Sequence, residues 1–432
     1  MKKFICMVLV SAMLISCIGC GSSGNSEVAN AENAAVDSSA TESAATVEEN
    51  VTEADDEATE NVAETEAVEG DAADEEATEE AVEEEVEEYS IKDLFAEHGI
   101  KAGTCLSASM IGNTKQKDLI LSQFSSVTME NAMKPENILE KDKSREAGDI
   151  VVEFNSDVIK MLDFAKENGL GVRGHTIVWY SQTPEWIFHE GFDIQNDLVS
   201  RDVMLARLES MIKQIFGLIE EGGYSDIFYA YDVANECWME DGTMRECKWK
   251  EVIGDDYLWY AFKYADTYAP ENIDLYYNDY NEQFKTQALV SLVDTLKDED
   301  GEYLIDGIGL QAHLYTSDNQ TLYFRTVDAL AQTGLKVEVT ELDVCLGAYQ
   351  DIKPATEDNL KAQGKFYYNI IRGLLDRVDA GTLNMDAITF WGFADSLSWR
   401  KEYSPLLYDM LYTPKYAYYG AMQISDKAGF KN

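Results

Sequence analysis

From residue 89 onward, short runs rich in β-branched and aromatic residues alternate with longer segments of helical periodicity. Apolar residues recur three or four positions apart from Leu208 through Ile215 to Ile219, which predicts a helix with one buried face. A second helix is expected from about Asp358 to Asp379. The predicted strands are Lys101–Ser107, Ser125–Asn131, Gly171–Trp179, Phe228–Glu236, Asp274–Asp279, Gly307–His313, Lys336–Val344 and Ala387–Phe393. Eight strands alternating with helices predict an α/β fold, the (β/α)8 TIM barrel, with a doubly wound open sheet as the alternative.

The first 20 residues have the pattern of a bacterial export signal. A lysine pair precedes an apolar run over residues 4–15, which is too short to remain as a membrane-spanning helix. The run ends in a segment, residues 14–17, that resembles the lipobox of bacterial lipoproteins, in which the cysteine is lipidated. We expect lipidation at Cys17 rather than Cys20, because leucine fits the third position before the cysteine better than cysteine does. The resemblance implies an exported chain, anchored at the cell surface by its lipid, or secreted if the signal is an ordinary cleaved one.

Residues 21–88 are strongly acidic, with 25 Asp and Glu and no Lys or Arg between positions 26 and 88. With almost no aromatic residues, this segment cannot bury enough apolar surface to fold, so we expect a disordered tether before a folded domain at 89–432. The whole chain has a formal charge of −47, which argues against a partner bound through nucleic-acid phosphates or anionic lipid headgroups. Its 45% hydrophobic content still allows a sizeable core.

Polar and aromatic residues gather where the predicted strands end. Because the C-terminal ends of barrel strands face one active site, we expect these side chains to meet there. They are Glu130, Asn131, His175, Trp179, Asn235, Glu236, Asn278, Gln311, His313, Glu341 and Trp391. The sequence contains no Gly-x-Ser-x-Gly elbow, phosphate loop or His-Glu-x-x-His zinc helix, and only four histidines. We therefore expect neither a metal nor a cofactor.

Two of these residues, Glu236 and Glu341, suit glycoside hydrolysis. In such a reaction one carboxylic acid protonates the leaving oxygen while the other attacks the anomeric carbon. Tryptophan faces and side-chain amides would hold the sugar ring and its hydroxyls. By this pattern alone, an enolase-type metal site or an ordinary ion pair is the alternative.

Six ordered segments then make the region recognisable. They are Ser126–Lys134, Gly174–Trp186, Tyr231–Glu236, Asp306–His313, Val339–Val344 and Trp391–Arg400. Together they resemble glycoside hydrolase family 10, the endo-β-1,4-xylanases, over about residues 89–427. The resemblance implies a TIM barrel that hydrolyses β-1,4-xylosidic bonds inside xylan with retention of configuration. It also implies xylan and xylo-oligosaccharides as partners, a monomeric state and no nucleic acid.

The resemblance also assigns roles. Glu236 matches the acid/base and Glu341 the nucleophile, with Asn235 holding the sugar 2-hydroxyl and His313 keeping Glu341 ionised. The other residues expected to bind substrate are Glu130, Asn131, Lys134, His175, Trp179, Gln182, Tyr280, Gln311, Trp391 and Trp399.

Two positions depart from the family pattern. Pro135 follows Lys134 where the family usually has tryptophan, so one stacking wall is expected to be missing or supplied elsewhere. Tyr180 follows Trp179 where the family usually has histidine, and a phenol carries no positive charge near neutral pH. Neither change removes a catalytic carboxylate, so we expect an active enzyme. A β-1,4-glucanase on the same barrel and a non-catalytic surface xylan-binding protein are the alternatives.

Four cysteines lie in the predicted barrel. Cys237 and Cys247 flank a loop after the expected acid/base, and the sequence leaves open whether they form a disulfide in an exported protein. Cys105 and Cys345 end different strands and are expected to be buried free thiols.

Overall fold

The computed structural model describes residues 89–431. The expected export signal, the lipidation at Cys17 or Cys20 and the acidic tether over residues 21–88 lie outside the described residues and stay predictions. Within residues 89–431, no helix is both long enough and apolar enough to cross a bilayer.

Eight parallel strands close into a barrel. They are β1 (Lys101–Leu106), β2 (Ser126–Met129), β3 (Gly171–Trp179), β4 (Phe228–Asn235), β5 (Asp274–Asp279), β6 (Gly307–Leu310), β8 (Lys336–Cys345) and β11 (Ala387–Phe390). Neighbours pair in order from β1 to β6, and β6 pairs with β8. β11 closes the sheet, because it pairs with β8 on one side and with β1 on the other. The predicted TIM barrel is confirmed, and the open doubly wound sheet is wrong.

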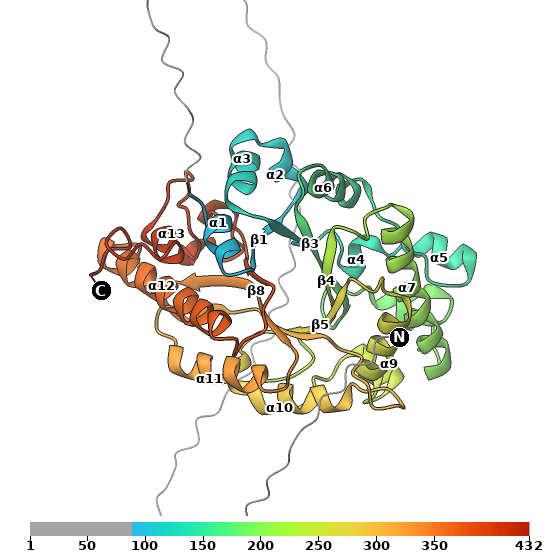
Figure 1. Cartoon of the computed structure of the whole chain (residues 1–432). Coiled ribbons are helices and arrows are strands. Elements are labelled where there is room, and N and C mark those ends of the chain that lie inside the picture. Colours follow the sequence, from blue (N-terminus) through green and yellow to red (C-terminus); the bar gives the residue numbers. More distant parts are fainter. Residues whose placement is uncertain (1–88, 432) are drawn as a thin grey trace, which may run out of the picture. The chain divides into compact units, whose positions relative to one another are not determined.

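Helices surround the strands, as Figure 1 shows. The α-helices are α1 (Ile91–Glu97), α2 (Ala108–Gly112), α3 (Thr114–Gln123), α4 (Pro135–Ile138), α5 (Lys141–Ala147), α6 (Ser156–Glu167), α7 (Arg201–Glu221), α8 (Lys248–Ile253), α9 (Tyr257–Tyr268), α10 (Glu282–Thr295), α11 (Gln320–Ala331), α12 (Glu357–Asp379) and α13 (Tyr416–Ala421). Short 3-10 helices η1 to η4 lie at Glu185–Phe188, Glu190–Phe192, Asp395–Leu397 and Lys401–Tyr403. A small hairpin joins β9 (Gly347–Ala348) to β10 (Asp351–Ile352).

The two helices expected from periodicity form where the sequence placed them. In α7 the predicted stripe, including Leu208, Ile215 and Ile219, is fully buried. The Ser200 side chain accepts a hydrogen bond from the backbone N–H of Val203 and so caps the first turn. The expected Asp358–Asp379 helix is α12, which begins one residue earlier.

The predicted strands Ser125–Asn131 and Ala387–Phe393 run past the observed ends of β2 and β11, and a third predicted strand is interrupted. The run Gly307–His313 does not continue as a single strand, because Ala312 has a φ of 56° and interrupts the ladder between β6 and β7 (His313–Tyr315). β7 then pairs with the end of β8, with His313 opposite Asp343. An apolar run predicts β-structure through this point, whereas the left-handed backbone that splits it leaves no signal in the hydrophobic pattern.

The barrel interior holds a buried charge network below the strand ends. Arg173 is fully buried, and its guanidinium contacts Asp232 Oδ1 at 2.5 Å and Glu338 Oε2 at 2.6 Å. The same guanidinium lies 4.3 Å from the centre of the Tyr276 ring, whose hydroxyl donates to Glu338. Burial raises the pKa of Glu338 to about 7, although Arg173 opposes the shift. Buried charges of this kind are tolerated because each is paired and hydrogen-bonded.

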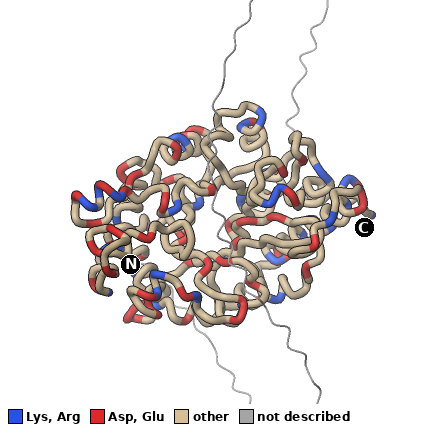
Figure 2. Tube along the Cα trace, turned by 180° about the vertical axis from the view of Figure 1, so that it is seen from behind, with Lys and Arg blue, Asp and Glu red and all other residues tan. Residues whose placement is uncertain are grey.

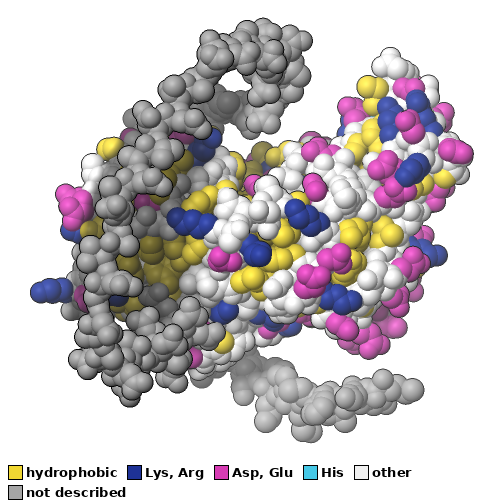
Figure 3. Space-filling model, turned by 90° about the horizontal axis from the view of Figure 1, so that it is seen from above, with side chains coloured by type: hydrophobic (Ala, Val, Ile, Leu, Met, Phe, Trp, Pro, Cys, Tyr) yellow, Lys and Arg dark blue, Asp and Glu magenta, His cyan; other side chains and the backbone are white. Residues whose placement is uncertain are grey.

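Acidic and basic residues are interspersed along the outside of the barrel, as Figure 2 shows. On the face in Figure 3, hydrophobic side chains form small groups between charged ones.

Candidate active site

The two glutamates predicted to do the chemistry come from β4 and β8. Glu236 directly follows β4, has a left-handed φ of 57°, and its backbone N–H donates to the Asn278 carbonyl at 2.9 Å. Glu341 lies within β8 and is only 5% exposed. Both residues therefore stand at the C-terminal end of the barrel.

A network of side-chain amides joins these two carboxylates. Asn278 Nδ2 donates to Glu341 Oε1 at 2.8 Å and to Asn235 Oδ1 at 3.0 Å. Gln311 Nε2 donates to Glu236 Oε1 at 3.0 Å and to Asn235 Oδ1 at 3.1 Å. We orient the Asn235 amide with its oxygen toward these two nitrogens because both are donors. The two carboxylates thus lie on the same rim and share one set of buried amide partners.

His313 sets the charge state around Glu341. Its Nε2 lies 3.2 Å from Glu341 Oε2, and its Nδ1 lies 3.1 Å from Asp343 Oδ2. Burial lowers the pKa of His313, but Asp343 and Glu341 outweigh burial and raise it to about 10. The imidazole is therefore positively charged at neutral pH, between two carboxylates.

Glu341 responds to the same contacts in the opposite direction. Burial raises the pKa of Glu341, but the hydrogen bond from His313 and the neighbouring positive charges together outweigh burial, and the net pKa is below the usual value. Nearby His175 and Lys134 act in the same direction as His313. Glu341 is accordingly an ionised, oriented carboxylate, the state that a nucleophile needs.

A second group of predicted residues converges on Lys134. The Lys134 ammonium donates to Asn131 Oδ1 at 3.0 Å and to Gln182 Oε1 at 2.9 Å, and lies 4.9 Å from the centre of a Trp179 ring. Burial lowers the pKa of Lys134, and burial raises the pKa of Glu130. Residues from the ends of β2 and β3 are thereby brought together as the sequence predicted.

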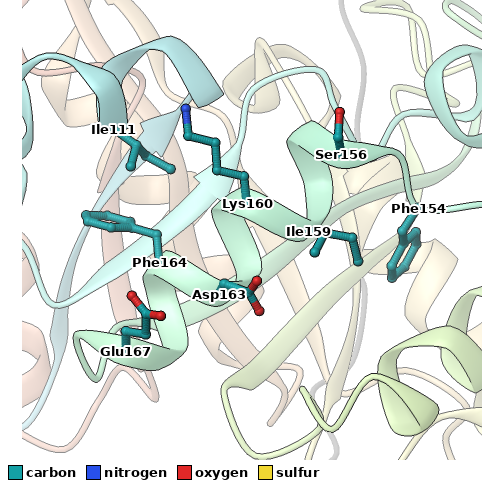
Figure 4. A pocket seen from close by; sticks show the side chains of 8 residues that line it. All are labelled: Ile111, Phe154, Ser156, Ile159, Lys160, Asp163, Phe164 and Glu167. Carbon is teal, nitrogen blue, oxygen red and sulfur yellow. The ribbon is translucent and has the colours of Figure 1, made fainter.

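Glu130 and Asn131 also line a hollow in the surface. The other residues that line it are Leu106, Ser107, Ala108, Ala132, Asn137, Asn155, Asp157 and Met161. A separate hollow lies on the outer wall and is shown in Figure 4. It is lined by Ile111, Phe154, Ser156, Ile159, Lys160, Asp163, Phe164 and Glu167, none of which is a predicted site residue.

The predicted tryptophans differ in exposure. Trp391 is 6% exposed and packs edge-on against His175, with ring centroids 5.6 Å apart, while His175 Nδ1 lies 2.9 Å from Asp232 Oδ2. Trp399 is 63% exposed and meets the His313 ring at a centroid distance of 5.4 Å. Of these two tryptophans, only Trp399 therefore has a largely exposed ring, and it lies beside His313, which contacts Glu341.

Arg245 joins the site although sequence reasoning missed it. Its Nε donates to the Glu236 carbonyl at 2.9 Å and its Nη2 to the Tyr280 hydroxyl at 3.0 Å. Its guanidinium also lies 4.1 Å from the centre of the Tyr180 ring. The predicted residue Tyr280 and the family departure Tyr180 are thus linked to Glu236 through one arginine. No strand ends at Arg245, so the rule that located the other residues could not find it.

Asp343 and Arg400 form a further contact that the predicted site lacked. Arg400 Nη1 donates to Asp343 Oδ1 at 2.6 Å, and Asp343 is the second carboxylate against His313. Asp343 stands two residues after Glu341 on β8, so both side chains point to the same face. The alternation of side chains along a strand could therefore have identified Asp343 as a neighbour of Glu341.

The cysteines of the described residues are free thiols. Cys105, Cys237 and Cys345 are buried, and Cys247 is partly exposed. The structure thus holds no bridge between Cys237 and Cys247, which the sequence had left open. The expectation of free buried thiols at Cys105 and Cys345 is confirmed.

A closed parallel barrel with two glutamates linked on its C-terminal rim is the arrangement of a glycoside hydrolase. Residues 90–424 match the sequence profile of glycosyl hydrolase family 10. The chain belongs to this family.

Known relatives agree with the assignment. The chain is 36% identical over 346 residues to the bifunctional endo-1,4-beta-xylanase of Ruminococcus flavefaciens, covering 78% of this chain but 34% of that protein. It thus spans about a third of that relative's length. The Clostridium thermocellum endo-1,4-beta-D-xylanase 10B, solved as CBM22-1–GH10 modules with xylohexaose, matches with a TM-score of 0.70 and 32% identity, over 80% of this chain and 69% of that one.

A third relative was solved with substrate fragments. The intracellular xylanase of Thermoanaerobacterium saccharolyticum matches with a TM-score of 0.67 and 30% identity, in two mutants that each carry alanine in place of a glutamate. One mutant is in complex with xylotriose and covers 76% of this chain and 97% of that chain. The other is in complex with xylotetraose and covers 77% of this chain and 97% of that chain.

Proposed function

We propose that this chain is a retaining endo-1,4-β-xylanase that cleaves xylan by double displacement. The observation that carries the proposal is the amide network through which Asn235, Asn278 and Gln311 connect Glu236 to Glu341. The two mutated glutamates of the Thermoanaerobacterium saccharolyticum xylanase are separated by as many residues as Glu236 and Glu341, which supports the pairing.

In the first step, Glu341 attacks the anomeric carbon of the xylose unit on the non-reducing side of the scissile bond. The new bond joins a Glu341 oxygen to that carbon, the glycosidic C–O bond breaks, and the proton of Glu236 passes to the leaving oxygen. The charge of His313 keeps Glu341 ionised before attack. Asn235 contacts Glu236 and is linked to Glu341 through Asn278, where it can hold the sugar 2-hydroxyl as positive charge develops on the ring.

In the second step, water replaces the glutamate. Glu341 has become a neutral ester, so Glu236 no longer faces a neighbouring negative charge there and can accept a proton from water. The resulting hydroxide attacks the anomeric carbon, the ester bond breaks, and the Glu341 carboxylate is restored. Two inversions leave the configuration retained.

The remaining predicted residues fit substrate binding. Lys134, Asn131 and Gln182 offer hydrogen-bonding groups beside the Trp179 ring, and exposed Trp399 offers a face for a sugar. We propose that they hold xylan and xylo-oligosaccharides.

The test compares reducing-sugar release from xylan and from carboxymethyl-cellulose by the full chain and by Glu341→Ala. We expect high release from xylan, little from cellulose, and loss of activity in the variant. Proton NMR of the first product formed should show the β-anomer. Preference for cellulose would favour a glucanase, xylan binding without release would favour a non-catalytic binding protein, and an active Glu341→Ala would overturn the assignment.

We further propose that residues 1–20 direct export and that lipid on Cys17 anchors the enzyme at the cell surface through the acidic segment 21–88. The support is the lipobox-like sequence and the acidic segment, which has no Lys or Arg between positions 26 and 88. Metabolic labelling with a fatty acid should mark the wild type and leave Cys17→Ala unmarked. Continued labelling of that variant, with loss in Cys20→Ala, would move the anchor to Cys20.

A further inference from the structure

The break between β6 and β7 positions a contact to each of the two glutamates. Gln311 lies just before Ala312 and donates to Glu236, while His313 lies just after it and contacts Glu341. Ala312 is buried and has a φ of 56°, a conformation that residues with a Cβ seldom adopt. Something in the structure must hold the backbone in this shape.

The last residue of β5 and the start of α10 contact this break. The backbone N–H of Gln311 donates to the Asp279 carbonyl at 2.9 Å. The next N–H, that of Ala312, donates to the side-chain carboxylate of Glu282 at 3.1 Å. The first of these bonds continues the ladder between β5 and β6, so only the amide of Ala312 leaves the ladder, and it is satisfied by the Glu282 side chain.

The Glu282 side chain is buried in the interior of the protein. It is 1% exposed at the start of α10, and burial raises its pKa to about 7. Lys285 on the same helix pairs instead with Asp279 at 2.8 Å and donates to the Trp238 carbonyl at 2.7 Å. A carboxylate without an ion-pair partner of its own is costly to bury, and its hydrogen bond to Ala312 is the contact that it makes to the site.

We propose that Glu282 is a positioning residue, which holds Ala312 in its left-handed conformation so that Gln311 and His313 reach the two glutamates together. The proposal deepens the hydrolase function above and rests on it. Glu282 touches neither glutamate, so its effect passes through the backbone of residues 311–313. Preorganised contacts of this kind matter because small displacements of catalytic groups cost large factors in rate.

The experiment compares Glu282→Ala and Glu282→Gln in the full chain, by steady-state kinetics on xylan and by NMR titration of the His313 side chain. Glu282→Ala should lower kcat by on the order of tenfold to a hundredfold with KM changed less than about threefold. The pKa of His313 should fall toward its ordinary value of about 6.5 as its contact with Glu341 loosens. Glu282→Gln should stay near wild type in both measurements, because its amide oxygen can accept the same N–H.

A second change tests the route of the effect. Ala312→Gly should restore much of the kcat lost in Glu282→Ala, because glycine adopts positive φ without help. Val293→Ala, a buried truncation on the same helix, is the control. It should lower the melting temperature and leave kcat and the His313 titration unchanged.

Two outcomes separate this inference from the proposed function. A Glu282→Ala protein that melts earlier but keeps kcat and the His313 titration would show that Glu282 only stabilises the fold, and would overturn the inference. A wild type without xylanase activity would overturn the proposed function, and the His313 titration would still decide the role of Glu282.

Discussion

The ion pairs of His313 predict how stability depends on pH. Its pKa is about 10 in the folded chain, because Glu341 and Asp343 face it, whereas an unfolded histidine titrates near about 6.5. A raised pKa means that the folded state binds the proton more tightly. The stabilisation is therefore complete below about pH 6.5 and is lost as the pH rises toward about 10.

The size of the effect follows from the same two pKa values. At about 1.4 kcal/mol for each pKa unit, the difference of about 3.5 is worth about 5 kcal/mol at low pH. Of this, about 2 kcal/mol should be lost between pH 6 and pH 8. The interaction is counted once here, from the histidine side, because the lowered pKa of Glu341 describes the same contact.

The assay is equilibrium urea unfolding of the wild type and of His313→Gln at pH 6 and pH 8. Subtracting the variant removes the contributions of titrating groups that do not contact His313. The free energy of unfolding of the wild type, minus that of His313→Gln, should fall by about 2 kcal/mol from pH 6 to pH 8. The same difference in free energy of unfolding at pH 6 and pH 8 would refute the reasoning. It would mean that Glu341 and Asp343 do not stabilise the charged form of His313.

Two further predictions concern residues whose contacts only the structure shows. Asn278→Ala removes the donor shared by Glu341 and Asn235, so kcat on xylan should fall by on the order of tenfold to a hundredfold, and an unchanged kcat would contradict the role of the amide network. Arg173→Met leaves Asp232 and Glu338 buried without their cation, so the free energy of unfolding should fall by about 3–5 kcal/mol, which denaturant unfolding can check. A loss below about 1 kcal/mol in that experiment would show that the two acids find other partners.

Several residues of the active-site rim could be predicted from the ends of the predicted strands alone. Glu236, Gln311 and Glu341 were found because each closes or continues a predicted strand, and barrel topology brings those ends together. Arg245 was missed because it reaches Glu236 from a loop, through a contact that depends on how the loop folds back. The left-handed turn at Ala312 was missed because an alanine in that conformation leaves no mark in the hydrophobic pattern.

The amino-acid pattern by itself predicted the order of strands and helices, favoured a barrel over an open sheet, and placed Glu236 and Glu341 near the ends of strands. These follow from local periodicity and from residue types, which act over a few neighbouring positions. Only the tertiary structure decided which amides contact these glutamates, since Asn278 reaches Glu341 and Gln311 reaches Glu236 from other strands. Their distances, burial and charge come from packing between distant parts of the chain, and those quantities set the pKa values on which the chemistry depends.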